Sequence, residues 1–73
     1  MRKIAIIGAG GFGREVKVLI DDINRTNLTF EIIGFFDDGV EKGTLVNGLP
    51  VLGKLSDINN INFNLCLAMG IGV

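Results

Sequence analysis

The sequence has no histidine, tyrosine or tryptophan, and one cysteine among its 73 residues. It also lacks the Gly-Lys-Ser/Thr of a P-loop, the Gly-x-Ser-x-Gly of a nucleophile elbow and any cluster of metal-ligand residues. Because Cys66 is alone, an internal disulfide and a cysteine-cluster metal site are excluded. Cys66 lies in an apolar run, where a small buried side chain is a more ordinary role than a reactive thiol. We therefore expect no catalytic residue and no metal site.

The sequence also lacks a large excess of either positive or negative charge and any long apolar run. The formal net charge is -1, and lysine and arginine are scattered, so we expect no nucleic-acid partner. No apolar stretch approaches the roughly 20 residues of a membrane helix, so we expect no membrane partner. The run Ile4–Ile7 is too short for the core of a signal peptide. The cytoplasm is therefore the expected location.

The length predicts one small domain, residues 1–73. A chain this short leaves roughly 40% of its unfolded surface exposed after folding. Apolar residues make up 48% of the sequence, which excludes disorder and is high for a domain with so much surface. We expect another protein surface to cover part of it.

The most informative segment is the apolar run Ile4–Ile7 followed at once by Gly8–Gly13, which has the pattern Gly-x-Gly-x-x-Gly. This pattern is typical of a strand joined to a phosphate-binding helix. Gly8 allows the tight turn, Gly10 leaves room for a diphosphate, and Gly13 lets the helix lie close to the sheet. The pattern favours phosphate binding, with a tight structural turn as the alternative.

A helix is predicted from Gly11 to about Arg25, because apolar residues recur there at helical spacing. The apolar positions expected to face the sheet are Phe12, Val16, Leu19, Ile20 and Ile23. The first strand, Lys3–Ile7, is apolar almost throughout, which is typical of a central strand in a parallel sheet. A second strand is predicted at Phe30–Phe36.

The rest of the chain is predicted to be less regular. The segment Gly39–Gly53 contains an Asn-Gly pair and the one proline, which favours a loop around a short edge strand, Pro50–Leu52. Ser56–Asn60 allows a turn or two of helix. Phe63–Met69 is predicted as the last strand.

The fold class is therefore α/β, a small Rossmann-like open parallel sheet. Right-handed crossovers give the order 3-2-1-4 for the four predicted strands, with the switch point between the first and the last. Glycines follow both of these strands, at Gly8–Gly13 and Gly70–Gly72. The long helix would cover one face of this incomplete sheet and the short one the other. The apolar last strand would form an open edge, which favours an N-terminal fragment of a longer chain; a dimer is the alternative.

Four side chains near the predicted crevice are candidates for contact with the ligand, and three of them have a second interpretation. Asp37 ends the second strand, where a carboxylate can accept hydrogen bonds from a ribose diol. Asp38 contacts the base or begins the turn with the glycine after it. Phe12 approaches the ligand or packs in the core, and Arg14 meets a phosphate or faces solvent. Because adjacent strand residues point to opposite faces, a joint site of the two aspartates is not expected.

Four segments together resemble the N-terminal domain of a family of bacterial sugar acyltransferases, the sialic-acid O-acetyltransferase and bacillosamine-type N-acetyltransferase group. They span most of the chain in the order of the family: Ile6–Val16, Ile33–Asp38, Gly48–Gly53 and Leu67–Gly70. One departure concerns Phe12, since many members have histidine there. The loss of that hydrogen-bonding group implies a different sugar.

The resemblance implies a domain that binds a nucleotide-linked sugar such as a UDP-sugar. In the family, a left-handed β-helix of hexapeptide repeats follows, binds acetyl-CoA, forms a trimer and supplies a catalytic histidine. This chain has neither the repeats nor histidine. We therefore expect it to bind no cofactor and to be inactive alone, with acetyl-CoA and the homo-oligomer belonging to the full-length enzyme. The implied substrate-binding residues are Gly8, Ala9, Gly10, Gly11, Phe12, Gly13, Asp37, Asp38 and Gly70.

The expected function is therefore substrate binding for acetyl transfer from acetyl-CoA to an amine or hydroxyl of a sugar. The alternative is the NAD-binding half of a Rossmann oxidoreductase, which needs the same glycines and acidic residue. A regulatory or oligomerising module is a third hypothesis. The segment Gly48–Gly53 and the Asp37-Asp38 pair favour the acyltransferase.

Overall fold

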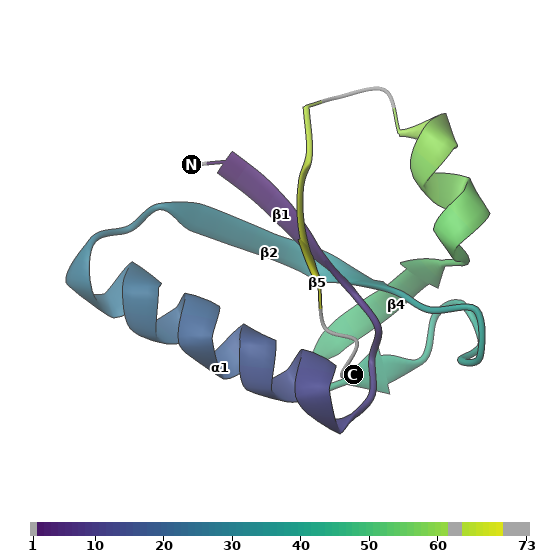
Figure 1. The fold of residues 1–73 in the computed structure, drawn as a ribbon, viewed down its shortest axis with the longest axis horizontal. Helices are drawn as coiled ribbons and strands as arrows, with labels where there is room; N and C mark the ends of the chain where they lie inside the picture. The colour runs from purple at the N-terminus through teal and green to yellow at the C-terminus, as the bar shows by residue number, and fades with distance from the viewer. Residues whose placement is uncertain (1, 62–63, 70–73) are drawn as a thin grey trace.

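The computed structural model describes residues 2–61 and 64–69, apart from the side chains of Phe12 and Met69. It is an open five-stranded sheet with a helix on one side and a short 3₁₀ helix on the other (Figure 1). The elements in chain order are β1 (Arg2–Ile7), α1 (Gly11–Thr26), β2 (Phe30–Phe36), β3 (Leu45–Val46), β4 (Leu49–Gly53), η1 (Leu55–Asn60) and β5 (Cys66–Met69).

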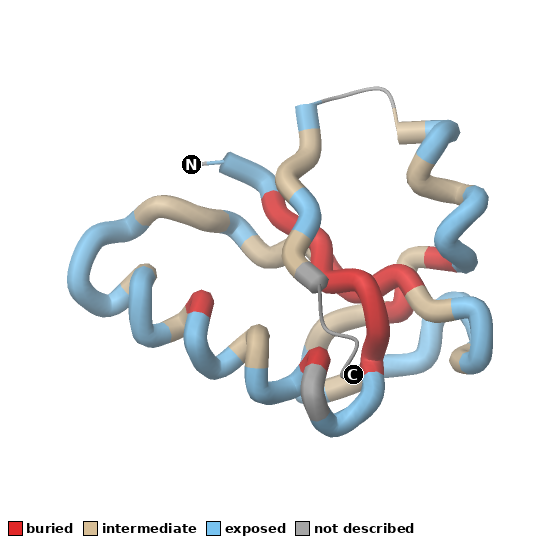
Figure 2. Tube along the Cα trace, in the orientation of Figure 1, coloured by how far each residue is buried: buried red, intermediate tan, exposed pale blue. Residues whose placement is uncertain are grey.

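The strand β1 has a neighbour on each side, as its apolar run predicts. It pairs in parallel with β2 on one side and with β5 on the other. Its residues Ile4–Ile7 are all buried, and Ala5 and Ile6 have no exposed surface. Figure 2 shows that the buried part of the chain is concentrated along this strand, the turn after it and the end of β2. The core therefore lies directly beside the carboxyl ends of these strands.

The order of the sheet is β3-β4-β2-β1-β5. The predicted order 3-2-1-4 is confirmed for the four parallel strands, but β3 was predicted as loop. Asn47 and Gly48 have φ values of 48° and 80°, which fit the two-residue turn of a β-hairpin. This turn brings β3 antiparallel to β4. The prediction that Pro50 lies in an edge strand is therefore wrong, because β3 covers the outer side of β4.

The helix α1 contacts the sheet through a narrower face than its apolar pattern predicts. Ile20 is buried and Val16 is half-buried against the core. Leu19 and Ile23, predicted to face the sheet, are 61% and 49% exposed. They lie on a flank of the helix beside the face formed by Gly13, Val16 and Ile20, because the 3.6-residue turn rotates them away from it.

The C-terminal part of the sheet also differs from the prediction. The strand β5 begins at Cys66, and Phe63 lies outside the described residues. Cys66 is half-buried and packs against the core, which agrees with a packing role. The short helix is a 3₁₀ helix; the Asp57 carboxylate accepts the Lys54 N–H at 2.8 Å at its start. Among the described helices, none has the length and apolar character that crossing a membrane requires.

A bulge in β2 brings the strands β2 and β4 unusually close together. The register with β1 passes from Ile32 directly to Gly34, so Ile33 is the extra residue. Gly34 has a φ of 150°, and a Cβ there would meet the Pro50 carbonyl oxygen and would lie 2.9 Å from Leu52 Cγ. Glycine is therefore needed at this position for both backbone conformation and space.

We predict that Gly34→Ala lowers the free energy of unfolding by roughly 3 kcal/mol or more, from backbone strain and overpacking together. Urea denaturation followed by circular dichroism measures the change. Gly43→Ala is the matched control, because Gly43 has a φ of 91° but a Cβ there would meet nothing within 4 Å. Its expected loss is roughly 1 to 2 kcal/mol from strain alone. Equal losses in the two variants would contradict the packing explanation.

Candidate functional site

The candidate site is a hollow of about 260 Å³ at the carboxyl ends of β1 and β2, lined by Gly8, Asp37, Asp38 and Leu55. The chain leaves β1 toward β2 on one side, and β5 returns to pair with β1 on the other. The hollow therefore lies beside the switch point of the sheet, where open α/β sheets bind their ligands.

Of the glycine turn, its first residue, Gly8, lines this hollow. Gly8 has a φ of 96°, which favours glycine, and its N–H donates to the Phe36 carbonyl at 2.8 Å. Gly13 is buried on the sheet side of α1. Gly10 is the N-cap of α1 and has an ordinary φ of -74°. A Cβ on Gly10 or on Gly11 would meet nothing within 4 Å. Neither φ nor packing therefore explains glycine at position 10.

Asp37 connects the glycine turn to the loop after β2. Its Oδ2 accepts the Ala9 N–H at 2.8 Å, and its Oδ1 accepts the Gly39 N–H at 2.7 Å. These two bonds lower the pKa of Asp37 from its ordinary value of 3.8, Ala9 more than Gly39, and partial burial opposes them. The carboxylate is thus ionised at neutral pH and has one backbone donor on each oxygen.

Asp38 connects the same loop to the segment after β4. Its Oδ1 accepts the Leu55 N–H, the first of η1, at 2.8 Å. Asp37 and Asp38 therefore reach different loops, as the alternation along an extended chain predicts. Asp38 therefore does more than begin a turn with Gly39. Its contact with Leu55 joins residues 17 positions apart, and no local sequence pattern indicates it.

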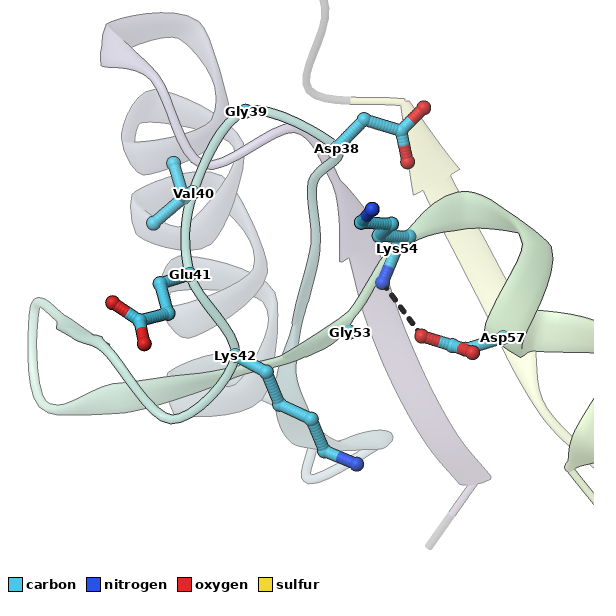
Figure 3. Close-up of a pocket in the computed structure, with 8 residues that line it drawn as sticks. All are labelled: Asp38, Gly39, Val40, Glu41, Lys42, Gly53, Lys54 and Asp57. Atoms are coloured by element: carbon cyan, nitrogen blue, oxygen red, sulfur yellow. Dashed lines mark hydrogen bonds between the residues drawn. The ribbon is translucent and has the colours of Figure 1, made fainter.

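A second hollow, of about 370 Å³, shares the lining residue Asp38 with the first. Figure 3 shows the loop from Asp38 to Lys42 curving around one side of it, with Gly53, Lys54 and Asp57 on the other. The ion pairs found within residues 2–61 and 64–69 are Lys17–Asp21 and Arg25–Asp22. Lys42 and Lys54 take part in neither of these pairs.

The structure brings together most of the predicted site residues at this edge. They are Gly8, Ala9, Gly10, Gly11, Gly13, Asp37 and Asp38. The side chain of Phe12 and the whole of Gly70 lie outside the described residues. Arg14 is exposed on α1, beside Gly11. Lys42, Lys54 and Leu55 line the two hollows but were not predicted from the sequence; of these, only Lys54 has a local signal, the Lys-x-x-Asp spacing at the start of η1.

The described side chains of the site include carboxylates and amines. In the part of the chain that the structure describes, no group of three or more histidine, cysteine or acidic side chains could hold a metal ion. The chemistry available at the edge is hydrogen bonding by backbone N–H groups, by the carboxylates of Asp37, Asp38, Glu41 and Asp57 and by the amines of Lys42 and Lys54. This set is suited to binding a polar ligand.

An open, mostly parallel sheet with a glycine turn at its switch point defines a small Rossmann-like α/β domain. The sequence model of the PglD N-terminal domain matches residues 3–72, so the chain belongs to this family. The family is the N-terminal domain of bacillosamine acetyltransferases, which confirms the resemblance in the sequence. No curated protein matches the chain.

We predict that the free energy of unfolding decreases as the pH falls below about 4, in part because of Asp37. Its folded-state pKa lies below the unfolded value near 3.8, so the folded chain binds fewer protons in this range. The stabilisation is therefore complete above that value and is lost as the pH falls through the lower folded pKa. Urea denaturation between pH 7 and pH 2.5 measures the loss.

In Asp37→Asn, the free energy of unfolding should decrease less as the pH falls below about 4. Asp22→Asn is the control, because it removes the same charge from a surface carboxylate whose ion pair, within residues 2–61 and 64–69, is with Arg25 on α1. A profile that is unchanged in Asp37→Asn, or equally changed in both variants, would contradict the assignment.

Proposed function

We propose that this chain is the acceptor-substrate domain of a sugar acetyltransferase and that its crevice binds a nucleotide-linked amino sugar. The membership in the PglD N-terminal domain family supports the sugar acetyltransferase class. The observation on which the proposal chiefly depends is the open space at Gly10, since a Cβ would fill it without meeting any other atom within 4 Å. A diphosphate that approaches the backbone closely needs such a space.

The backbone at this turn is suited to an anion. The helix α1 has 16 residues, and its first N–H groups have no carbonyl partner within the helix. The Gly10 N-cap makes no side-chain hydrogen bond to them. Together with the helix dipole, these free donors favour a phosphate group at the start of α1.

The second hollow is large enough for the nucleoside half of the ligand. It shares the lining residue Asp38 with the first and is lined by charged side chains of both signs. The base would lie between the loop Asp38–Lys42 and the start of η1, with the diphosphate at the glycine turn. The sugar would then lie at the open end of the crevice, where a second domain could act on its amine or hydroxyl.

The chemical step is assigned to a part of the enzyme other than these residues. Acetyl-CoA would bind the β-helical part found in such acyltransferases, and a base there would remove the proton from the acceptor. The role of this domain is to bind and orient the sugar nucleotide, so residues 1–73 are expected to bind ligand without turnover.

Saturation-transfer NMR with the chain tests the ligand class. We predict a signal for a UDP-linked amino sugar that UDP displaces, and none for NADH at the same concentration. The reason is that the family relation favours sugar nucleotides, whereas the glycines and acidic residue alone would suit either ligand. A signal for NADH alone would contradict the proposal and favour the oxidoreductase.

We predict that Gly10→Val weakens binding of the UDP-linked sugar by roughly tenfold or more, since its side chain would occupy phosphate space. Gly10→Ala should have a smaller effect in the same direction. Neither variant should lower the free energy of unfolding strongly, because the φ of -74° and the open space tolerate a side chain. Isothermal titration calorimetry and urea denaturation measure the two quantities.

Ser56→Val is the control, because it adds apolar volume at an exposed position of η1 that lines neither hollow. If Gly10→Val binds the ligand as tightly as the unaltered chain, the turn is structural and the proposed site is wrong.

A further inference from the structure

The loops at the carboxyl edge of the sheet are joined through one residue. The Asp37 carboxylate accepts the Ala9 N–H of the glycine turn and the Gly39 N–H of its own loop. The backbone N–H of Asp37 donates to the Gly53 carbonyl at the end of β4 at 3.0 Å. The ends of β1, β2 and β4 therefore meet at Asp37. We call the two carboxylate contacts, with Ala9 and Gly39, the Asp37 bridge.

The glycine turn needs such a bridge for a physical reason. Glycine residues restrict the backbone less than any others, so a turn with glycine at positions 8, 10 and 11 has little stiffness of its own. A turn that binds phosphate through N–H groups must hold those groups in a fixed direction before the ligand arrives. The bond from Ala9 to Asp37 fixes the middle of the turn, one residue before Gly10.

We propose that Asp37 is a positioning residue, which supports ligand binding through the glycine turn instead of by contact with the ribose diol. The inference rests on the proposed function, since it concerns binding of the same nucleotide. Each oxygen of the carboxylate already accepts one backbone N–H, so a diol would meet only the remaining lone pairs or would have to displace the Ala9 and Gly39 N–H groups. Displacement of the Ala9 N–H by a hydroxyl would leave a part-buried donor without an acceptor, so it is unfavourable.

A cycle of one protein change and one ligand change separates the two roles. We compare UDP with 2′,3′-dideoxy-UDP, each titrated into the unaltered chain and into Asp37→Asn. For a positioning residue, Asp37→Asn weakens both ligands by the same factor, roughly tenfold. Removal of the two ribose hydroxyls then changes the Kd by the same factor in both proteins, within about twofold. Asp22→Asn, which removes the same charge from the surface of α1, should bind UDP as the unaltered chain does.

If Asp37 contacts the diol, the unaltered chain binds UDP more tightly than 2′,3′-dideoxy-UDP, whereas Asp37→Asn binds the two with equal affinity. That result overturns the proposal. So does an Asp37→Asn variant that is folded and binds UDP with unchanged affinity.

A second measurement needs neither ligand nor variant. In ¹⁵N-resolved NMR spectra, the Ala9 and Gly39 amide protons should shift together as the pH falls through the titration of Asp37, because both donate to its carboxylate. An Ala9 amide that does not respond shows that the bridge is absent in solution and overturns the proposal even if Asp37→Asn does not fold. If the bridge is present and UDP does not bind, the proposed function fails, and the role of the bridge in binding fails with it.

Discussion

The parallel hydrogen-bond ladders on both sides of β1 constrain the rest of the structure. Because β2 and β5 run in the same direction as β1, all three strands end at one edge of the sheet. A parallel neighbour also requires a crossover, and α1 is the crossover from β1 to β2. The apolar run Ile4–Ile7 can be buried on both faces only in this central position. The location of the crevice is therefore a consequence of how the chain buries its most apolar strand.

The same edge shows two different uses of glycine. Gly34 and Gly53 are explained by their neighbours, since a Cβ on Gly34 would meet the Pro50 carbonyl and one on Gly53 would meet the Asp57 carboxylate. Gly10 has no such neighbour and an ordinary φ. The first two glycines allow backbone segments and a capping carboxylate to come close, whereas the third leaves a space next to free N–H groups. A glycine that the fold does not require is the one that a ligand explains best.

The sequence predicts the parts of the fold whose signals are local. The bounds of β2 are those of its apolar run, and α1 ends one residue from the prediction, because glycine and apolar spacing mark them clearly. The two-residue strand β3 is too short to show alternation. The exposure of Leu19 and Ile23 depends on how α1 lies on the sheet, which the helical pattern does not determine. Periodicity gives the apolar side of a helix, not the width of the surface it contacts.

The site follows the same division between local and distant signals. The glycine turn and Asp37 are recognisable because each ends a strand, but the bond between Ala9 and Asp37 joins residues 28 positions apart. Likewise Lys54 reaches the second hollow only because β4 pairs with β2. On the proposed function, this division has a consequence for specificity. Backbone N–H groups at the glycine turn bind any diphosphate, so selection among nucleotides depends on the side chains of the second hollow, which only the folded chain brings together.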